Sequence, residues 1–207
     1  MSIPPVSPVA AILLAAGASS RMGTPKALLP TADGLPLAAR QLLLLHEAGF
    51  SPLILVAGKH HDRIRDALAG LPSLHDTPFQ LVDNQAWPTG RLSSVQAGLR
   101  ALSASSPAAL LLPVDAAGIR LDTFRAIRDA WLAVASAYPA QPIRPFCNGQ
   151  KGNALLVPAA LFKAVLALPP DARLDEWARP RAWPLPLHDP ALLANYNTPA
   201  DWAARPV

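Results

Sequence analysis

The sequence predicts an α/β fold in which a mostly parallel central sheet lies between two layers of helices. Continuous apolar runs at 10–16, 52–57 and 108–114 are typical of strands buried on both faces of a parallel sheet. Segments with helical spacing separate them, as in βα units. The chain has 207 residues, of which 51% are hydrophobic and 15% charged, so it can bury a sizeable core. We expect one domain over 1–207, with 1–8 as a loose, proline-rich tail.

Composition narrows the classes of partner. The net charge is +4, and the basic residues are scattered without aromatic interleaving, so we expect no nucleic-acid partner. A mild positive balance suits small polyanions. No apolar run reaches membrane-spanning length, and no basic segment precedes the first one, which therefore predicts a core strand rather than a signal peptide. The single cysteine, Cys147, fits a reducing compartment. We expect a cytoplasmic protein with no membrane partner, and a monomer rather than a large oligomer.

The first apolar run leads into a loop of small residues, Ala-Ala-Gly-Ala-Ser-Ser, followed by the cations Arg21 and Lys26. Small side chains let the backbone N–H groups approach a ligand closely. Strand, loop and two cations together indicate a cradle for a polyphosphate. The alternative is an ordinary turn of an α/β protein, because glycine-containing loops are common there. The stretch is neither a P-loop nor a dinucleotide fingerprint, since the required glycine and lysine spacing is missing.

The next elements alternate between helix and strand. Helical spacing predicts a helix at 35–48, with Pro36 near its first turn and Gly49 just past its end. The run at 52–57 predicts a strand that ends at Gly58. A short helix is expected at 60–69 and a third strand at 79–82. The pair His60-His61 is interpreted as a polar first turn rather than a metal site, because no third ligand has useful spacing.

The stretch after the third strand contains Gly90, Ser93 and Ser94. Either serine could cap the helix that follows, which would be a purely structural role. The same helix N-terminus could instead face a ligand. Both interpretations stay open on the sequence.

The run at 108–114 ends in Asp115. Ligands of open α/β sheets gather at the carboxyl ends of strands. A carboxylate there, on a chain that also has a phosphate loop, predicts a ligand of Mg²⁺, which prefers carboxylates and phosphate oxygens. The alternative is a cap for the next helix, expected at 121–136.

The C-terminal third is richer in proline and less regular. An edge strand is expected at 143–146 and a helix at 159–168. Lys151 would suit a second phosphate, or it is an exposed loop lysine. Near the end of the chain, Thr198 and Pro199 predict a helix start.

Two long stretches resemble the MobA-like nucleotidyltransferases. LAAGASSRMGTPKALL at 14–29 matches the family signature L-A-[AG]-G-x-S-x-R-M-G-x-x-K-x-L-L without a gap, and 84–99 matches N-x-x-W-x-x-G-x-x-S-S-[LV]-x-x-G-L. Shorter matches surround Asp115, 149–157 and 195–202. The chain departs from the family where a proline should follow Asp115, at Ala154, and in a shortened loop at 171–173.

The resemblance implies a three-layer, Rossmann-like nucleotidyltransferase fold. It also implies the reaction, in which the nucleoside monophosphate of an NTP is joined to an acceptor phosphate and pyrophosphate is released. Arg21, Lys26 and Asp115 would be catalytic. Asp115 and Asn197 would hold Mg²⁺, although many relatives have Asp at the second position. The nucleotide would be bound by Leu14, Ala15, Ala16, Gly17, Ser19, Ser20, Arg21, Met22, Gly23, Lys26, Gly58, Asn84, Ser93 and Ser94, and the acceptor by Lys151, Gly152 and Asn153.

The nucleotide and acceptor are predicted from smaller clues. Relatives with L-A-A-G tend to use CTP, and Ala16 in place of glycine narrows the base pocket. This favours CTP and a molybdopterin-type acceptor, as in molybdenum cofactor cytidylyltransferase. The terminal Asn-Tyr-Asn-Thr-Pro is closer to the GTP-using molybdopterin guanylyltransferases. A sugar-phosphate nucleotidyltransferase, or a nucleotide-binding protein that has lost catalysis, would also fit these motifs.

Overall fold

The computed structural model describes residues 8–204, so the expected tail lies outside the described residues apart from its last position. Strands and helices alternate through the first two thirds of the chain, as expected. The strands are β1 (Ala10–Ala15), β2 (Leu53–Ala57), β3 (Phe79–Asp83), β4 (Ala108–Pro113), β5 (Ile143–Cys147), β6 (Gln150–Lys151), β7 (Leu155–Pro158) and β8 (Trp183–Pro186). The helices are α1 (Leu37–Glu47), α2 (His61–Leu68), α3 (Arg91–Ala101), α4 (Leu121–Val134), α5 (Phe162–Leu166), α6 (Leu174–Ala178) and α7 (Pro199–Ala203).

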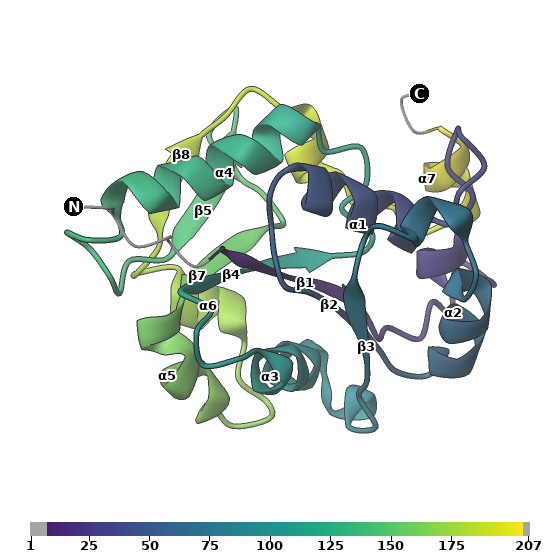
Figure 1. The fold of residues 1–207 in the computed structure, drawn as a ribbon, viewed down its shortest axis with the longest axis horizontal. Helices are drawn as coiled ribbons and strands as arrows, with labels where there is room; N and C mark the ends of the chain where they lie inside the picture. The colour runs from purple at the N-terminus through teal and green to yellow at the C-terminus, as the bar shows by residue number, and fades with distance from the viewer. Residues whose placement is uncertain (1–7, 205–207) are drawn as a thin grey trace.

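Within the described residues the strands form one eight-stranded sheet in the order β3-β2-β1-β4-β7-β5-β6, with β8 paired to β5 (Figure 1). The first four strands in this order pair in parallel. Strand β7 pairs antiparallel with both β4 and β5. The predicted α/β class with a mostly parallel sheet is confirmed. The carboxyl ends of β1 and β4 therefore lie side by side at one edge of the sheet.

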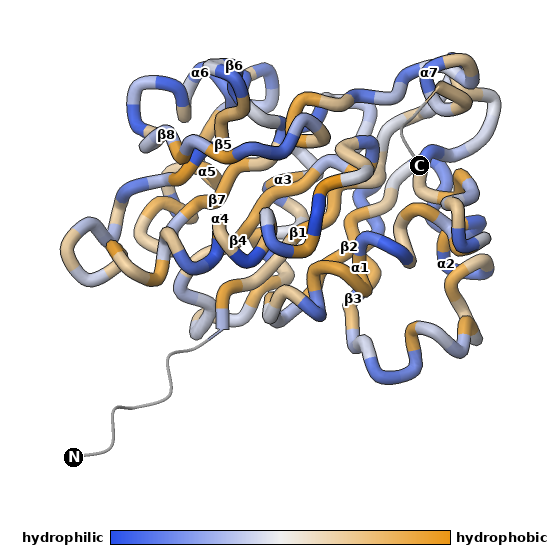
Figure 2. Tube along the Cα trace, turned by 90° about the horizontal axis from the view of Figure 1, so that it is seen from above, coloured by the Kyte–Doolittle hydropathy of each residue, from blue (hydrophilic) through white to orange (hydrophobic). Residues whose placement is uncertain are grey.

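Helices cover both faces of this sheet (Figure 1). Helices α1 and α4 pack on one face with Leu13, and α3, α5 and α6 pack on the other with Ile12. Successive residues of a strand point to opposite faces, so a strand buried on both faces must be continuously apolar. Figure 2 shows the consequence, because the tube is hydrophobic along the central strands and hydrophilic mainly in the outer loops.

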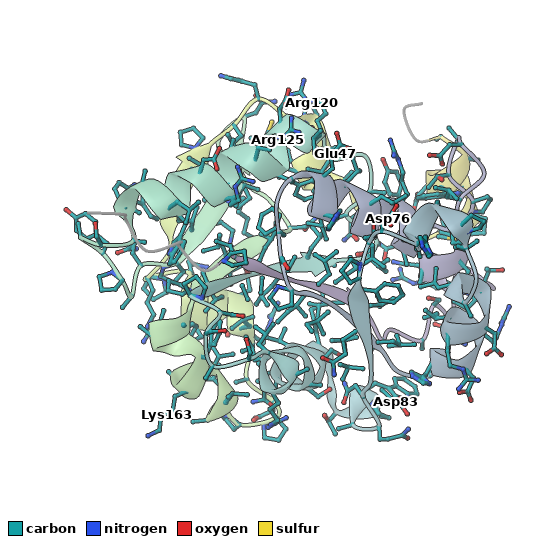
Figure 3. The ribbon with its side chains drawn as sticks, in the orientation of Figure 1. Glu47, Asp76, Asp83, Arg120, Arg125 and Lys163 are labelled. Atoms are coloured by element: carbon teal, nitrogen blue, oxygen red, sulfur yellow. The ribbon has the colours of Figure 1, made fainter. Side chains whose placement is uncertain are left out.

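The outer surface of the α1 and α4 layer carries charged side chains. Glu47 on α1 and Arg125 on α4 lie together there, 3.9 Å apart between Oε1 and Nη2 (Figure 3). No helix in the described part of the chain combines the length and the hydropathy needed to span a bilayer.

The C-terminal third differs from the prediction. The strand expected at the edge, β5, lies inside the sheet, because the unpredicted β8 pairs with it in parallel. The N–H of Trp183, the first residue of β8, donates to the carbonyl oxygen of Pro142. The N–H of Leu187, directly after β8, donates to the carbonyl oxygen of Phe146. Pro184 and Pro186 stand at positions that face away from β5, so the backbone N–H that proline lacks is not needed for this pairing. A proline-rich segment argues against a strand in sequence, and this explains the error.

The helices of this third are also shorter than expected. Instead of one helix at 159–168, a 3-10 turn at Ala159–Leu161 leads into the five-residue α5. Helix α6 was not predicted, because five residues are too few to show a helical period.

Candidate active site

A cleft of about 380 Å³ opens at the carboxyl ends of β1 and β4. Parallel strands end at the same edge, so the loops that follow them face each other there. The loop after β1 forms one wall, and the start of α3 and the residues after β4 form the others. The lining residues are Leu14, Ala15, Ala16, Gly17, Ala18, Ser19, Ser20, Arg21, Lys26, Trp87, Gly90, Arg91, Ser94, Pro113, Val114, Asp115 and Asn197.

Lys26 is the centre of this cleft. Its Nζ donates hydrogen bonds to Asp115 Oδ2 at 2.6 Å and to Asn197 Oδ1 at 2.9 Å. The side chains of Lys26 and Asp115 are only 15% and 14% exposed, so their charges are partly shielded from water. The fold thus brings together three polar groups from the β1 loop, the end of β4 and the segment before α7.

Ser19 shapes the loop after β1. It adopts φ +50°, and its hydroxyl accepts the backbone N–H of Lys26 at 3.1 Å. Its carbonyl accepts the N–H of Met22 at 3.0 Å, and the Met22 side chain is buried in the core. The loop is therefore held by its own residues, while Ser20 and Arg21 stay exposed on the cleft wall.

The first turn of α3 is fixed by a buried asparagine. Asn84 Nδ2 donates to Ser93 Oγ at 2.9 Å and to Ser94 Oγ at 3.0 Å. Of the two interpretations left open for these serines, the one in which either of them caps the helix is wrong. Helix α3 begins at Arg91 after Gly90, whose φ of +124° an L-residue rarely adopts. Ser94 nevertheless lines the cleft, so its hydroxyl is held in place there.

Trp87 is a lining residue that the sequence reasoning did not single out, although it stands in the family motif. A Cβ at Gly58 would lie 2.8 Å from Trp87 Cβ and 2.9 Å from the carbonyl oxygen of Ala16. Only glycine lets these two walls approach so closely. Gly58 therefore contributes by making room for Trp87 rather than by lining the cleft.

The interpretation of Asp115 as a helix cap is also wrong. Helix α4 begins at Leu121, and its preceding residue makes no side-chain cap. The buried Asp189 satisfies this turn instead, because its Oδ2 accepts the N–H of Arg120 at 3.0 Å and the hydroxyl of Thr123 at 2.6 Å. Asp115 is thus left facing Lys26.

Thr198 caps α7 as predicted, in a reciprocal capping box with Asp201. Asp201 Oδ2 also accepts the N–H of Asn197 at 3.0 Å. These backbone and hydroxyl donors, together with the charge of Arg21, hold the pKa of the Asp201 carboxyl below its usual value. The capping box therefore orients the backbone that carries Asn197.

A second cleft of about 250 Å³ adjoins the first and shares Leu14, Arg91 and Pro113 with it. The further lining residues are Val95, Leu111, Arg144, Lys151, Gly152, Asn153, Leu155, Arg173, Leu174 and Asp175. All three predicted acceptor residues lie here. Asn153 has a structural task as well, because its Nδ2 donates to Ala194 O at 2.8 Å.

A known family model matches most of the chain. The model of the MobA-like NTP transferase domain matches residues 11–185, a range that includes every lining residue of the two clefts except Asn197. The chain belongs to the MobA-like NTP transferase family.

Curated relatives of this MobA-like NTP transferase include two bifunctional GlmU proteins. That of Kineococcus radiotolerans is 37% identical over 114 residues, 54% of this chain and 22% of the relative. That of Geobacter metallireducens is 34% identical over 147 residues, 69% of this chain and 29% of the relative. The matched region is thus less than a third of these longer proteins.

Solved structures share the fold over most of the MobA-like chain. Rv0371c of Mycobacterium tuberculosis superposes with a TM-score of 0.75 at 23% identity, covering 95% of this chain and 97% of that one. A nucleotidyl transferase of Methanothermobacter gives 0.75 at 20% identity, covering 95% of each chain. A 4-diphosphocytidyl-2C-methyl-D-erythritol synthase of Anaerococcus prevotii gives 0.66 at 16% identity, covering 93% and 94%.

The predicted nucleotide residues of the MobA-like transferase divide into two groups. Most of them line the first cleft, among them Ala16, Gly17, Arg21 and Lys26. The ones that do not line it are Met22, Gly23, Gly58, Asn84 and Ser93. The walls of the cleft are held in shape by four of these residues, namely Met22, Gly58, Asn84 and Ser93. The sequence reasoning assigned no cleft role to Arg91, Arg144 or Arg173, although Arg173 stands in the shortened family loop at 171–173.

Arg144 is the most buried cation of the second cleft, with a side chain 10% exposed. Its Nη2 lies 3.0 Å from Asp175 Oδ1, and its Nη1 donates to Gly152 O at 3.3 Å. Burial lowers the pKa of Arg144, and the charge of Asp175 opposes that shift. Burial also acts to raise the pKa of Asp175, but a hydrogen bond from Lys151 and the surrounding cations outweigh it and hold that pKa below its usual value.

Proposed function

We propose that this MobA-like transferase moves the nucleoside monophosphate of an NTP, with CTP favoured, onto an acceptor phosphate and releases pyrophosphate. The observation that carries the proposal is the Lys26 ammonium, which is held by Asp115 and Asn197 at 2.6 and 2.9 Å inside the cleft of the β1 loop. A cation placed beside two oxygen ligands, under a loop of small residues, fits the charged tail of a nucleoside triphosphate.

Asp115 and Asn197 are also the residues that would hold Mg²⁺. They offer one carboxylate and one amide oxygen, a hard oxygen donor set that suits Mg²⁺ when substrate phosphates complete it. The described residues contain no group of three or more His, Cys, Asp and Glu able to hold a metal. We assign the remaining Mg²⁺ ligands to the substrate phosphates. A bound Mg²⁺ would neutralise phosphate charge. Asn197 is a weaker donor for a hard cation than Asp would be.

In this reaction the protein has to neutralise the negative charge of the phosphates rather than transfer a proton. A phosphate monoester has its second pKa at about 6, so at neutral pH it is already largely a dianion and needs no general base. The described lining of the first cleft contains no His or Glu. We assign Lys26 and Arg21 to the triphosphate, where they would stabilise the charge that develops on the departing pyrophosphate.

CTP is favoured by the shape of the loop. Ala16 lines the cleft, and its methyl group takes space that a glycine would leave to a purine. A molybdopterin-type cofactor is the acceptor we favour, because it accompanies the L-A-A-G sequence in relatives. GTP is the second candidate, supported by the terminal Asn-Tyr-Asn-Thr-Pro that carries Asn197.

Two measurements test this proposal. Thermal unfolding with each NTP and Mg²⁺ tests binding, because a ligand at 100 times its dissociation constant adds roughly 2.7 kcal/mol of stability. Pyrophosphate release with a molybdopterin acceptor then tests transfer. We expect CTP to stabilise the protein most and to support release. Stabilisation without release for any acceptor would indicate a nucleotide-binding protein that has lost catalysis, and stabilisation by GTP alone would overturn the choice of CTP.

A further inference from the structure

The second cleft carries more positive than negative charge. Arg91, Arg144, Lys151 and Arg173 line it, against the single carboxylate of Asp175. Its remaining walls are mostly apolar, and apolar walls of low dielectric concentrate the field of such a charge cluster. The cleft therefore favours an anion.

Asp175 is shared among the cations around it. Its Oδ2 accepts a hydrogen bond from Lys151 Nζ, while its Oδ1 lies 3.0 Å from Arg144 Nη2. The two cations differ in freedom, because the side chain of Lys151 is 53% exposed and that of Arg144 is 10% exposed. Arg144 is also tied to Gly152 O, so it stays in place. Lys151, on a flexible stem at the surface, is free to exchange partners.

We propose that this cleft binds the phosphate of the acceptor and that Asp175 is an internal competitor, displaced from Lys151 when the phosphate enters. The inference rests on the proposed function, which already takes a phosphate monoester as the acceptor, and adds to it the ion pair that the acceptor breaks on binding. Such a group carries a charge of about −1.5 to −2 and three strong acceptor oxygens. It therefore attracts the Lys151 ammonium more strongly than the Asp175 carboxylate does. A neutral alcohol gives no such compensation for the broken ion pair.

The same phosphate chemistry could come from the tail of the nucleotide, because the two clefts adjoin. The acceptor is the better match, since Arg21, Lys26 and Asp115 line only the first cleft and Lys151 and Asp175 only the second. Each cleft thus has its own lysine, held by its own aspartate. Occupation of both at once would bring an acceptor phosphate next to the triphosphate.

The test uses phenyl phosphate as the probe and calorimetric titration of the full chain, with and without saturating CTP and Mg²⁺. We expect Asp175→Asn to bind phenyl phosphate about two- to fivefold more tightly, the change that corresponds to one partly exposed ion pair. Lys151→Met should bind it more weakly, and phenol should not bind. The matched control is Asp171→Asn, which removes the same charge from an exposed position near α6 that does not line the cleft. Its affinity should equal that of the wild type.

Five outcomes decide between these possibilities. Equal tightening in Asp171→Asn and Asp175→Asn would reduce the effect to net charge and overturn the proposal, as would weaker binding in Asp175→Asn. If Asp175→Asn does not fold, an unchanged affinity in Lys151→Met overturns it. Loss of phenyl phosphate binding once CTP is bound would assign the cleft to the triphosphate instead. Tighter binding in Asp175→Asn without stabilisation by any NTP would support the competitor role while contradicting the proposed function.

Discussion

Two lysine–aspartate pairs lie in adjoining clefts of this molecule, and they differ in burial. Lys26 and Asp115 are 15% and 14% exposed, and the lysine has Asn197 as a further partner. Lys151 and Asp175 are 53% and 32% exposed, and here it is the aspartate that has further partners.

The difference in burial implies a difference in use. Charges act more strongly on one another where water is excluded, so the Lys26 pair is suited to stabilising charge during the transfer. An exposed pair is worth little and exchanges easily, so the Lys151 pair is suited to recognising a charged substrate. Substitutions in the first pair should therefore change turnover, and those in the second should change affinity.

The largest expected effect is on the shielded pair. Lys26→Met should lower kcat for pyrophosphate release by a factor on the order of 10² to 10³, judged from the removal of single stabilising donors. Lys163→Met is the matched control, because Lys163 lies on α5 and lines neither cleft (Figure 3). Near-normal turnover in both Lys26→Met and Asp115→Ala would break the comparison.

The wall that Trp87 forms in the first cleft gives the next effect. Gly58→Ala forces a Cβ to within 2.8 Å of Trp87, so it should cost about 1–3 kcal/mol of unfolding free energy and weaken nucleotide binding. Gly17→Ala is the control for stability, because a Cβ at Gly17 meets nothing within 4 Å. Urea denaturation of both variants measures the difference. Equal stabilities would show that the Trp87 wall moves freely.

Asn197→Asp tests the contribution of Asn197, the second hydrogen-bond partner of Lys26. A second carboxylate should lower the Mg²⁺ concentration needed for half-maximal stabilisation by CTP, by roughly three- to tenfold, because ligand charge tunes the affinity for hard cations. Asn195→Asp adds the same charge at an exposed position two residues away and should leave that concentration unchanged. A shift of equal size in both variants would assign the effect to charge in general.

The smallest effect belongs to the exposed pair. Because the pKa of Asp175 lies below its ordinary value of 3.8, its ionised form stabilises the fold above that pH, and the contribution is lost as pH falls through the lower folded value. Asp175→Asn should therefore cost less than about 1 kcal/mol at pH 7 and nothing at the acid end of the titration. Unfolding measured from pH 7 downward tests this. A cost that persists in acid would point to packing instead of charge.

The parallel half of the fold is predictable because burial of a strand on both faces produces an apolar run of consecutive residues. Strands β1, β2 and β4 are covered on both faces, so each leaves a continuous apolar run that a short window detects. The β5 and β8 region has no such apolar run, because prolines interrupt both strands. They are tolerated where the missing N–H faces away from the partner strand. The error about the edge strand follows directly from that.

The candidate site divides in the same way. The small-residue loop, Lys26 and Asp115 are recognisable in sequence, since each follows the end of a predicted strand. The sequence could not reject the alternatives in which Ser93, Ser94 or Asp115 caps a helix. Asn84 holds the two serines and Asp189 holds the start of α4, through contacts across 9 to 69 positions of the chain.

The sequence by itself determined the α/β class, the family and the presence of a loop suited to phosphate, because apolar periodicity and contiguous motifs are local properties. Only the tertiary structure decided that Lys26 meets both Asp115 and Asn197, 89 and 171 positions away, and that Arg144, Lys151 and Asp175 form one charged cluster. These contacts depend on how the sheet orders its strands. No local pattern encodes that order, because it is set by packing of the whole core.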